Sequence, residues 1–438
     1  MHKTWVKISF WVLTLFVAGG FIFHWKLFRI PRQKIEAIEQ RLKSEGRAMT
    51  LSDLAPDPIP EAENAAPFYL DAYRILETLK HEEENIFEWI RKLDQPTTEP
   101  AMLVQVKALF ETGEFSDAME LLDQATGMED CQFDLNYDSG ANMLLPHITH
   151  MMKLSGLLRK RIQIQVDDGN PAGAGDALKT LNVLASRLDQ EPLLISQLVR
   201  VANIELYKDA LAYVLAHTEP DAAFLDEMDQ QLAKLSRDPF SPNWMDSERL
   251  YFLSILRSED FSTYSGYGNL WDQLPDVWDT AVYLCHLATP VLDELCFLEM
   301  ILHLEKVYTQ PFYEIDWDAL EQRIEEIPDP FFLSKNAFWS PSRSQAKQIS
   351  GKLMIQQAGI VVELYRIRLK REAFPEDLSG FATETVQDPF SGKDLKYEMT
   401  DDGFRLYSVG PNQIDDHGIK NRKTDKDDLL WSHPYVVQ

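Results

Sequence analysis

The residues best suited to chemistry in this 438-residue chain are the oxygen donors of one polar loop near its C-terminal end. The loop opens at residues 410–412 (Gly-Pro-Asn) and runs down to Asp427 and Asp428. Calcium takes six to eight hard oxygen ligands, and a turn-rich segment of Asp and Asn supplies them flexibly. The loop also carries four basic residues, Lys420, Arg422, Lys423 and Lys426. Because these weaken its attraction for a cation, two interpretations stay open: a calcium site and a solvated loop of mixed charge.

Elsewhere we find no spacing typical of a catalytic or metal site. His147 and His150 could share one helix face, but a zinc site needs more ligands and no H-E-x-x-H order is present. The sequence also lacks a nucleophile elbow, a phosphate-binding loop and a dinucleotide fingerprint. Acidic pairs abound, yet none can be nominated as an acid/base couple without geometry. We therefore predict no catalytic residues and no enzymatic activity, with an unrecognised carboxylate-based enzyme as an alternative.

Composition limits the classes of partner. The chain has 70 acidic and 43 basic residues and a net charge of −27, which argues against nucleic acid as a partner. A hydrophobic fraction of 45% is typical of a packed core.

The three cysteines, Cys131, Cys285 and Cys296, do not form a disulfide framework. Cys285 and Cys296 could pair only if the chain reverses at Pro290, because one continuous helix would hold them roughly 16 Å apart.

The N-terminal residues 1–28 predict a transmembrane anchor. Residues 8–23 carry no charge, Trp5 and Trp25 flank them, and the run is long enough to span a bilayer. The alternative is a cleaved signal peptide, but bulky residues follow the apolar run where small ones should stand. Flanking basic residues, counted literally, favour a cytoplasmic body, whereas long domains translocate largely regardless of charge. We predict a single-pass protein of the cell membrane with an extracytoplasmic, periplasmic body.

Helical patterns dominate the next three hundred residues. Residues 29–63 predict a juxtamembrane helix that stops at Gly46, followed by a proline-rich extended linker. Residues 64–343 predict a domain of stacked antiparallel helical hairpins, with helices at 146–166, 171–188, 191–217 and 221–235 among them. Stacks of this kind usually present surfaces to partners. A protein partner is therefore expected.

The pattern changes in the last segment, residues 344–438. A long helix over 344–371 ends before Pro375 and Gly380. Residues 395–399 and 404–409 then alternate with period two around the turn at 401–403, which predicts a β-hairpin. The fold class is therefore mainly α, with a small C-terminal β-hairpin module.

This ending resembles a known family. The order "YRIRLKREAFPEDL", "DPFSGKDLKY", "GFRLYSVGPNQIDD" and "DDLLW" is similar to the C-terminal part of the major pseudopilin of type II secretion, over about residues 345–431. Most of the chain, including "NAAPFYLDAY", also resembles single-span bacterial envelope proteins of unknown function. The chain departs from pseudopilins in its leader, because Gly20-Phe21 lies inside the apolar run and not before it. That order argues against a pilus subunit.

The pseudopilin resemblance implies one calcium ion in the C-terminal loop. Carried over by position, Val409 would give a carbonyl, Asn412 a side-chain oxygen and Asp428 a carboxylate. The remaining places would fall to the other acidic residues of the loop, Asp415, Asp416, Asp425 and Asp427. The chain departs from the family here too, because Asn412 stands where an Asp is usual and the loop is longer.

The sequence thus predicts a membrane-anchored, non-enzymatic envelope scaffold that binds a protein partner. An accessory component of a type II secretion or pilus-like machine is the second interpretation.

Overall fold

The computed structural model describes residues 25–81, 84–93, 100–235, 243–258, 279–329, 331–338, 340–421 and 426–433. Over these residues the chain is mainly helical with one three-stranded antiparallel sheet, so the predicted fold class is confirmed at that level. Within them, no helix is both long enough and apolar enough to cross a bilayer. The predicted anchor lies outside the described residues except for its last four positions, which belong to the π-helix η1 (Trp25–Arg29).

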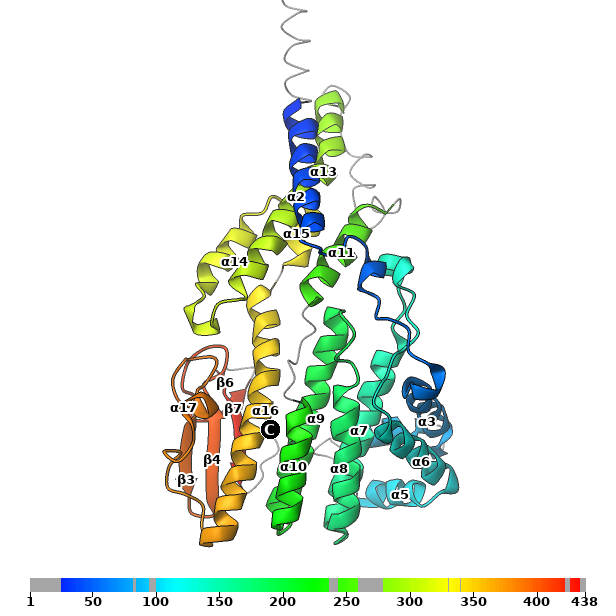
Figure 1. The fold of residues 1–438 in the computed structure, drawn as a ribbon, viewed down its shortest axis with the longest axis vertical. Coiled ribbons are helices and arrows are strands. Elements are labelled where there is room, and N and C mark those ends of the chain that lie inside the picture. The colour runs from blue at the N-terminus through cyan, green and yellow to red at the C-terminus, as the bar shows by residue number, and fades with distance from the viewer. Residues whose placement is uncertain are drawn as a thin grey trace, which may run out of the picture.

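Helices α2 (Ile30–Ser44) and α13 (Asp279–Val307) lie together at the upper end of the molecule (Figure 1). Helix α2 carries Pro31 in its first turn and ends just before Gly46, whose φ of +74° suits glycine. It buries Ile35 and Leu42, and Ile35 joins a core cluster that α13 supplies with Leu298 and others. A helix is therefore present within residues 29–63, where one was predicted, and it packs against the body.

Helix α13 runs through Pro290 without ending. Cys285 and Cys296 therefore lie on one continuous helix, the arrangement that excludes a disulfide between them. Cys296 and Cys131 are free thiols, and the side chain of Cys285 lies outside the description.

Five long helices lie side by side in the lower half of the molecule as drawn, between the sheet on one side and α3 (Ala66–Thr78) and α6 (Gly113–Gly127) on the other (Figure 1). They are α7 (Pro146–Asp167), α8 (Pro171–Ser186), α9 (Leu194–His217), α10 (Ala222–Leu235) and α16 (Pro341–Arg371). The α7–α8 hairpin turns at Gly169, with a φ of +74°, and Asn170 caps α8 by accepting from the N–H of Gly173 at 3.1 Å. These helices match the predicted ranges to within about three residues at most ends.

Other elements surround this bundle. Upstream of it are η2 (Leu51–Leu54), η3 (Glu61–Glu63), α3 (Ala66–Thr78), α4 (Ile86–Leu93), α5 (Pro100–Phe110), α6 (Gly113–Gly127) and η4 (Tyr137–Asn142). Between α10 and α16 are α11 (Trp244–Leu256), α13, η7 (Phe312–Glu314), α14 (Trp317–Glu325) and α15 (Phe332–Ala337). Two-residue strands pair as β1 (Lys80–His81) with β2 (Glu84–Asn85) and as β5 (Lys420–Asn421) with β6 (Lys426–Asp427). The predicted linker is extended around Pro56 and Pro58, and Gln132 holds it by donating to the carbonyls of Pro56 and Asp57.

The sheet has the order β3-β4-β7 and follows the short helix α17 (Thr383–Val386). Strands β3 (Lys396–Thr400) and β4 (Gly403–Ser408) form the predicted hairpin, with Thr400 paired to Gly403. Strand β7 (Leu429–His433) pairs antiparallel with β4 and was not predicted, because the run before Trp431 is too short to show an alternating pattern. The predicted β-hairpin therefore becomes a three-stranded sheet.

The sheet packs beside α16, and its strand β7 also contacts α9 (Figure 1). Lys208 of α9 donates to the carbonyl of Leu430 at 3.1 Å, and Gln357 of α16 donates to that of Leu429 at 2.8 Å. On the other flank, the ring of Phe312 meets that of Phe390 edge-on at 5.0 Å. The C-terminal residues therefore share one hydrophobic core with the bundle.

We expect Gly403→Ala to destabilise the protein by about 1–3 kcal/mol, the usual cost of overpacking. A Cβ at Gly403 would clash with the carbonyl oxygen of His433, so β4 and β7 would have to separate. Urea unfolding measures the change in free energy. Gly380→Ala is the matched control, since a Cβ there meets nothing within 4 Å. Equal stability of the two variants would contradict the prediction.

Candidate functional site

The C-terminal loop begins where β4 ends. Val409 is buried, and its N–H donates to the Oδ2 of Asp388 at 3.1 Å. Asn412 lies in the following turn, where its Oδ1 accepts from the N–H of Ile414 at 2.8 Å. Its Nδ2 donates to the Oδ2 of Asp416 at 3.1 Å. The structure therefore brings two of the predicted ligand residues, Asn412 and Asp416, into direct contact.

Asp415 is bound by other side chains. Its Oδ1 accepts from the hydroxyl of Tyr407 at 3.2 Å and from the N–H of His417 at 3.0 Å. The Nζ of Lys396 lies 3.4 Å from its Oδ2. Burial raises the pKa of Asp415, but these hydrogen bonds and the charge of Lys396 lower it by more, so the net shift is downward. A positive charge thus already occupies one side of this carboxylate.

Asp428 is the buried acid of the loop. Its side chain is fully enclosed, and its Oδ2 accepts from the N–H of Gly418 at 2.7 Å. Its Oδ1 has no hydrogen-bond partner in the described part of the chain. Burial raises the pKa of Asp428, and the charges of Asp416 and Asp415 raise it further, although backbone hydrogen bonds oppose them. A buried, unpaired carboxylate oxygen next to two other acids is what a bound cation would stabilise.

The remaining predicted ligands are not placed. Asp425 lies outside the described residues, and of Asp427 only the backbone, in β6, is described. Across the described ranges, no three His, Cys, Asp or Glu side chains stand close enough together to hold a metal ion. Among the described residues, the Oδ1 of Asp428 is therefore the one loop carboxylate oxygen with an observation in favour of a cation, and the calcium site stays a prediction.

Calcium is expected to raise the melting temperature of the wild type and to leave that of Asp428→Asn unchanged. At a calcium concentration of about 100 times Kd the gain in stability would be about 2.7 kcal/mol. Without calcium, Asp428→Asn should be at least as stable as the wild type, because the amide carries no charge for burial to penalise. Calorimetry with calcium and with magnesium measures both effects. Asp402→Asn in the exposed hairpin turn is the control, and equal shifts in wild type and Asp428→Asn would contradict the prediction.

Asp388 was not predicted, yet it organises the start of the loop. It is 1% exposed. Besides the N–H of Val409, its carboxylate accepts from the hydroxyl of Ser408 at 2.8 Å, the N–H of Phe390 at 2.9 Å and the hydroxyl of Ser391 at 3.1 Å. The signal was present in "DPFSG", because an Asp before a Pro and a Gly commonly accepts from nearby turn amides.

The two histidines do not form one site. The Nε2 of His147 lies 3.1 Å from the Oε2 of Glu191, which also accepts from the hydroxyl of Ser196 at 2.5 Å. The ring of His150 instead stacks on that of Tyr73 at 3.8 Å. Because Glu191 stands between serine and histidine, the histidine is not placed to take a proton from Ser196. This buried network joins α7 to α9.

The same region contains Glu248 of α11, whose pKa burial raises to about 7. Because the folded pKa lies above the unfolded value of 4.5, its stabilising effect is complete below pH 4.5 and is lost as the pH rises through 7. We therefore expect Glu248→Gln to be more stable than the wild type at pH 8, with the gain vanishing near pH 4.5. The gain should be about 1.4 kcal/mol for each pH unit that separates the folded and unfolded pKa values. Urea unfolding at both pH values measures it. The exposed Glu120→Gln is the control, and an equal gain there would contradict the prediction.

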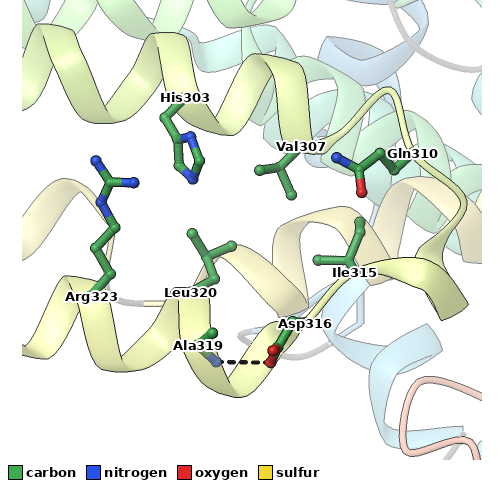
Figure 2. A pocket seen from close by; sticks show the side chains of 8 residues that line it. All are labelled: His303, Val307, Gln310, Ile315, Asp316, Ala319, Leu320 and Arg323. Atoms are coloured by element: carbon green, nitrogen blue, oxygen red, sulfur yellow. Dashed lines mark hydrogen bonds between the residues drawn. The ribbon is translucent and has the colours of Figure 1, made fainter.

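A hollow of about 260 Å³ lies between α13 and α14. Figure 2 shows His303 and Val307 facing Leu320 across it, with Arg323 at one end and Asp316 towards the other. Asp316 is the carboxylate among the lining residues, and its Oδ1 accepts from the N–H of Ala319 at 3.0 Å as a helix cap. Burial, with the charges of Arg323 and Lys306, lowers the pKa of His303. Among the described residues that line this hollow there is no pair of carboxylates, so a couple of two acids is not assembled there.

Comparison of the chain with protein-family models, with curated proteins and with solved structures finds no match.

Proposed function

We propose that this chain is a non-enzymatic, membrane-anchored envelope protein whose helical body binds a protein partner on the periplasmic side. The observation that supports partner binding is a pair of exposed apolar side chains on the body, Leu144 at 83% and Ile195 at 47%. Leu144 stands three residues before His147 and Ile195 next to Ser196, and Glu191 bonds both of those residues. Both apolar side chains therefore lie at the same end of the bundle. Exposed apolar side chains at one end of a bundle are candidates for an interaction site.

The partner surface is testable by photo-crosslinking in cells. A photoreactive amino acid at position 144 or 195 should give protein-sized adducts in the membrane fraction. The same residue at position 369, which is 50% exposed at the far end of α16, is the control. Adducts at 144 and 195 but not at 369 are expected. Their absence at both positions would refute the proposed partner surface, and extraction of the protein by an alkaline wash would refute the anchor.

A second candidate is an accessory role in a type II secretion or pilus-like machine. Its support is the order of elements at the C-terminal end, where α16 leads into the sheet and the Asp428 loop, together with the sequence resemblance to the pseudopilin ending. Ile414 is 61% exposed and Ile419 is 45% exposed on this loop. Calcium-dependent adducts at 414 and 419, lost on chelation, would favour this candidate over the first.

A further inference from the structure

The segment from Trp25 to Ile35 differs in charge from the rest of the protein. It contains four basic residues and no acidic one, in a chain whose net charge is −27. We call the four, Lys26, Arg29, Arg32 and Lys34, the basic collar. The collar occupies η1 and the first turns of α2, at one end of the long axis of the molecule (Figure 1).

The collar is open to a partner. All four basic residues are exposed, and within the described residues Lys26, Arg29 and Arg32 form no ion pair. Lys34 lies 3.7 Å from Glu299 on the surface, a contact of little strength because both side chains are more than half exposed. The positive charge of the collar is therefore largely unbalanced by the protein itself.

Two apolar side chains accompany these charges. Trp25 is 40% exposed and Ile30 is 38% exposed, and the guanidinium of Arg29 lies 5.7 Å from the ring centre of Trp25. Tryptophan beside lysine and arginine is the composition of protein segments that lie at the level of lipid headgroups. A surface that contacts only water does not need an exposed tryptophan.

The collar is also fixed to the body. Arg257, just after α11, bonds Glu39 of α2 at 2.6 Å and Glu294 of α13 at 2.9 Å. Just after α2, Arg47 bonds Asp246 of α11 at 2.6 Å and Glu305 of α13 at 2.7 Å. These two sets of ion pairs connect α2, near its middle and just after its end, to α11 and α13. A molecule bound at the collar would therefore be connected to the whole body.

We propose that the basic collar binds the headgroups of anionic phospholipids and thereby sets the orientation of the body on the membrane. The inference rests on the proposed anchor, because the collar directly follows it in the sequence. Anionic headgroups attract basic residues next to a span, and each such residue adds to the attraction. The strongly acidic remainder of the body is repelled by the same surface, so the long axis points away from the bilayer.

The test uses the full chain reconstituted into phosphatidylcholine vesicles with traces of spin-labelled phosphatidylglycerol or phosphatidylcholine. Electron paramagnetic resonance reports which label is enriched around the protein. At low salt the wild type should enrich the anionic label about threefold over the neutral one, and high salt should reduce this. The variant K26Q/R29Q/R32Q should lose the preference.

The control K179Q/K370Q/R371Q removes the same number of exposed charges from α8 and from the end of α16, and should keep the preference. No preference in the wild type, or an equal loss in the control, would overturn the inference while leaving the anchor intact. Release of the wild type by an alkaline wash would overturn the anchor and the inference together. Unchanged thermal melting of both variants shows that their folds are preserved.

Discussion

Asp246→Ala is expected to destabilise the protein by about 3–5 kcal/mol, the range for removing one partner of a buried ion pair. The carboxylate of Asp246 holds two arginines. Its Oδ1 accepts from the Nη2 of Arg249 at 2.8 Å and from the Nη2 of Arg47 at 2.6 Å. Arg249 is 1% exposed, and of its hydrogen bonds to described residues only the one to the carbonyl of Ala48 at 2.6 Å would remain without Asp246. A buried guanidinium would thus lose its counter-charge.

The matched control for this change is Asp318→Ala. Asp318 stands in the first turn of α14 as Asp246 does in the first turn of α11, so both changes alter a helix N-terminus similarly. Asp318 is exposed, and we expect its replacement to shift the free energy of unfolding by less than about 1 kcal/mol. Urea unfolding measures both variants. Equal values would show that the buried arginines do not depend on Asp246.

The same variant gives a local readout. Because Arg47 and Ala48 follow α2, the Asp246 network is one of the two sets of ion pairs that hold this helix against the body. Amide hydrogen exchange of α2 should therefore become faster in Asp246→Ala, and that of α8, far from the network, should change less. Unchanged exchange in α2 would mean that the ion pairs of Arg257 alone hold the helix.

Asp388→Ala is expected to cost at least about 3 kcal/mol, because buried donors left without an acceptor each cost about 1–3 kcal/mol. The two hydroxyls and two amides that Asp388 accepts from belong to its own turn and to the end of β4. Alanine removes the acceptor for all of them at once. Asp388→Asn should cost less, since the amide oxygen can still accept.

The control for Asp388 is Asp394→Ala, a few residues later in the same segment. Asp394 is exposed and joins its neighbour Gln387 through a backbone bridge that alanine preserves. Urea unfolding compares the variants, and hydrogen exchange at the amide of Val409 reports the lost bond directly. Protection of Val409 that survives in Asp388→Ala would contradict the assigned role.

Much of the helical organisation was predictable from local signals. Proline in a first turn and glycine after a last one marked the ends of α2 and the α7–α8 turn, because these residues fit those backbone angles and few others do. Period-two alternation predicted the β3–β4 hairpin for the same kind of local reason. Strand β7 was missed because its only described partner strand, β4, lies about twenty residues away and its own residues carry little pattern.

The candidate loop, too, was only partly predictable from the sequence. Its donor residues could be named from composition and resemblance, and Asn412 and Asp416 do meet at 3.1 Å. What could not be named is which acid is buried. Asp428 and Asp388 are enclosed, whereas Asp415 lies near the surface beside Lys396. Burial depends on how the sheet packs on α16, and no spacing of acidic residues encodes it.

The amino-acid sequence by itself determined the helix ends, the hairpin, the acidic net charge and the basic collar, because each depends on residues close together in the chain. The tertiary structure alone decided which charges are paired and which are buried. Arg47 meets Asp246 across 199 residues, and Ser408 meets Asp388 across 20. Contacts between distant segments follow from packing of the core, and packing is a property of all the elements together.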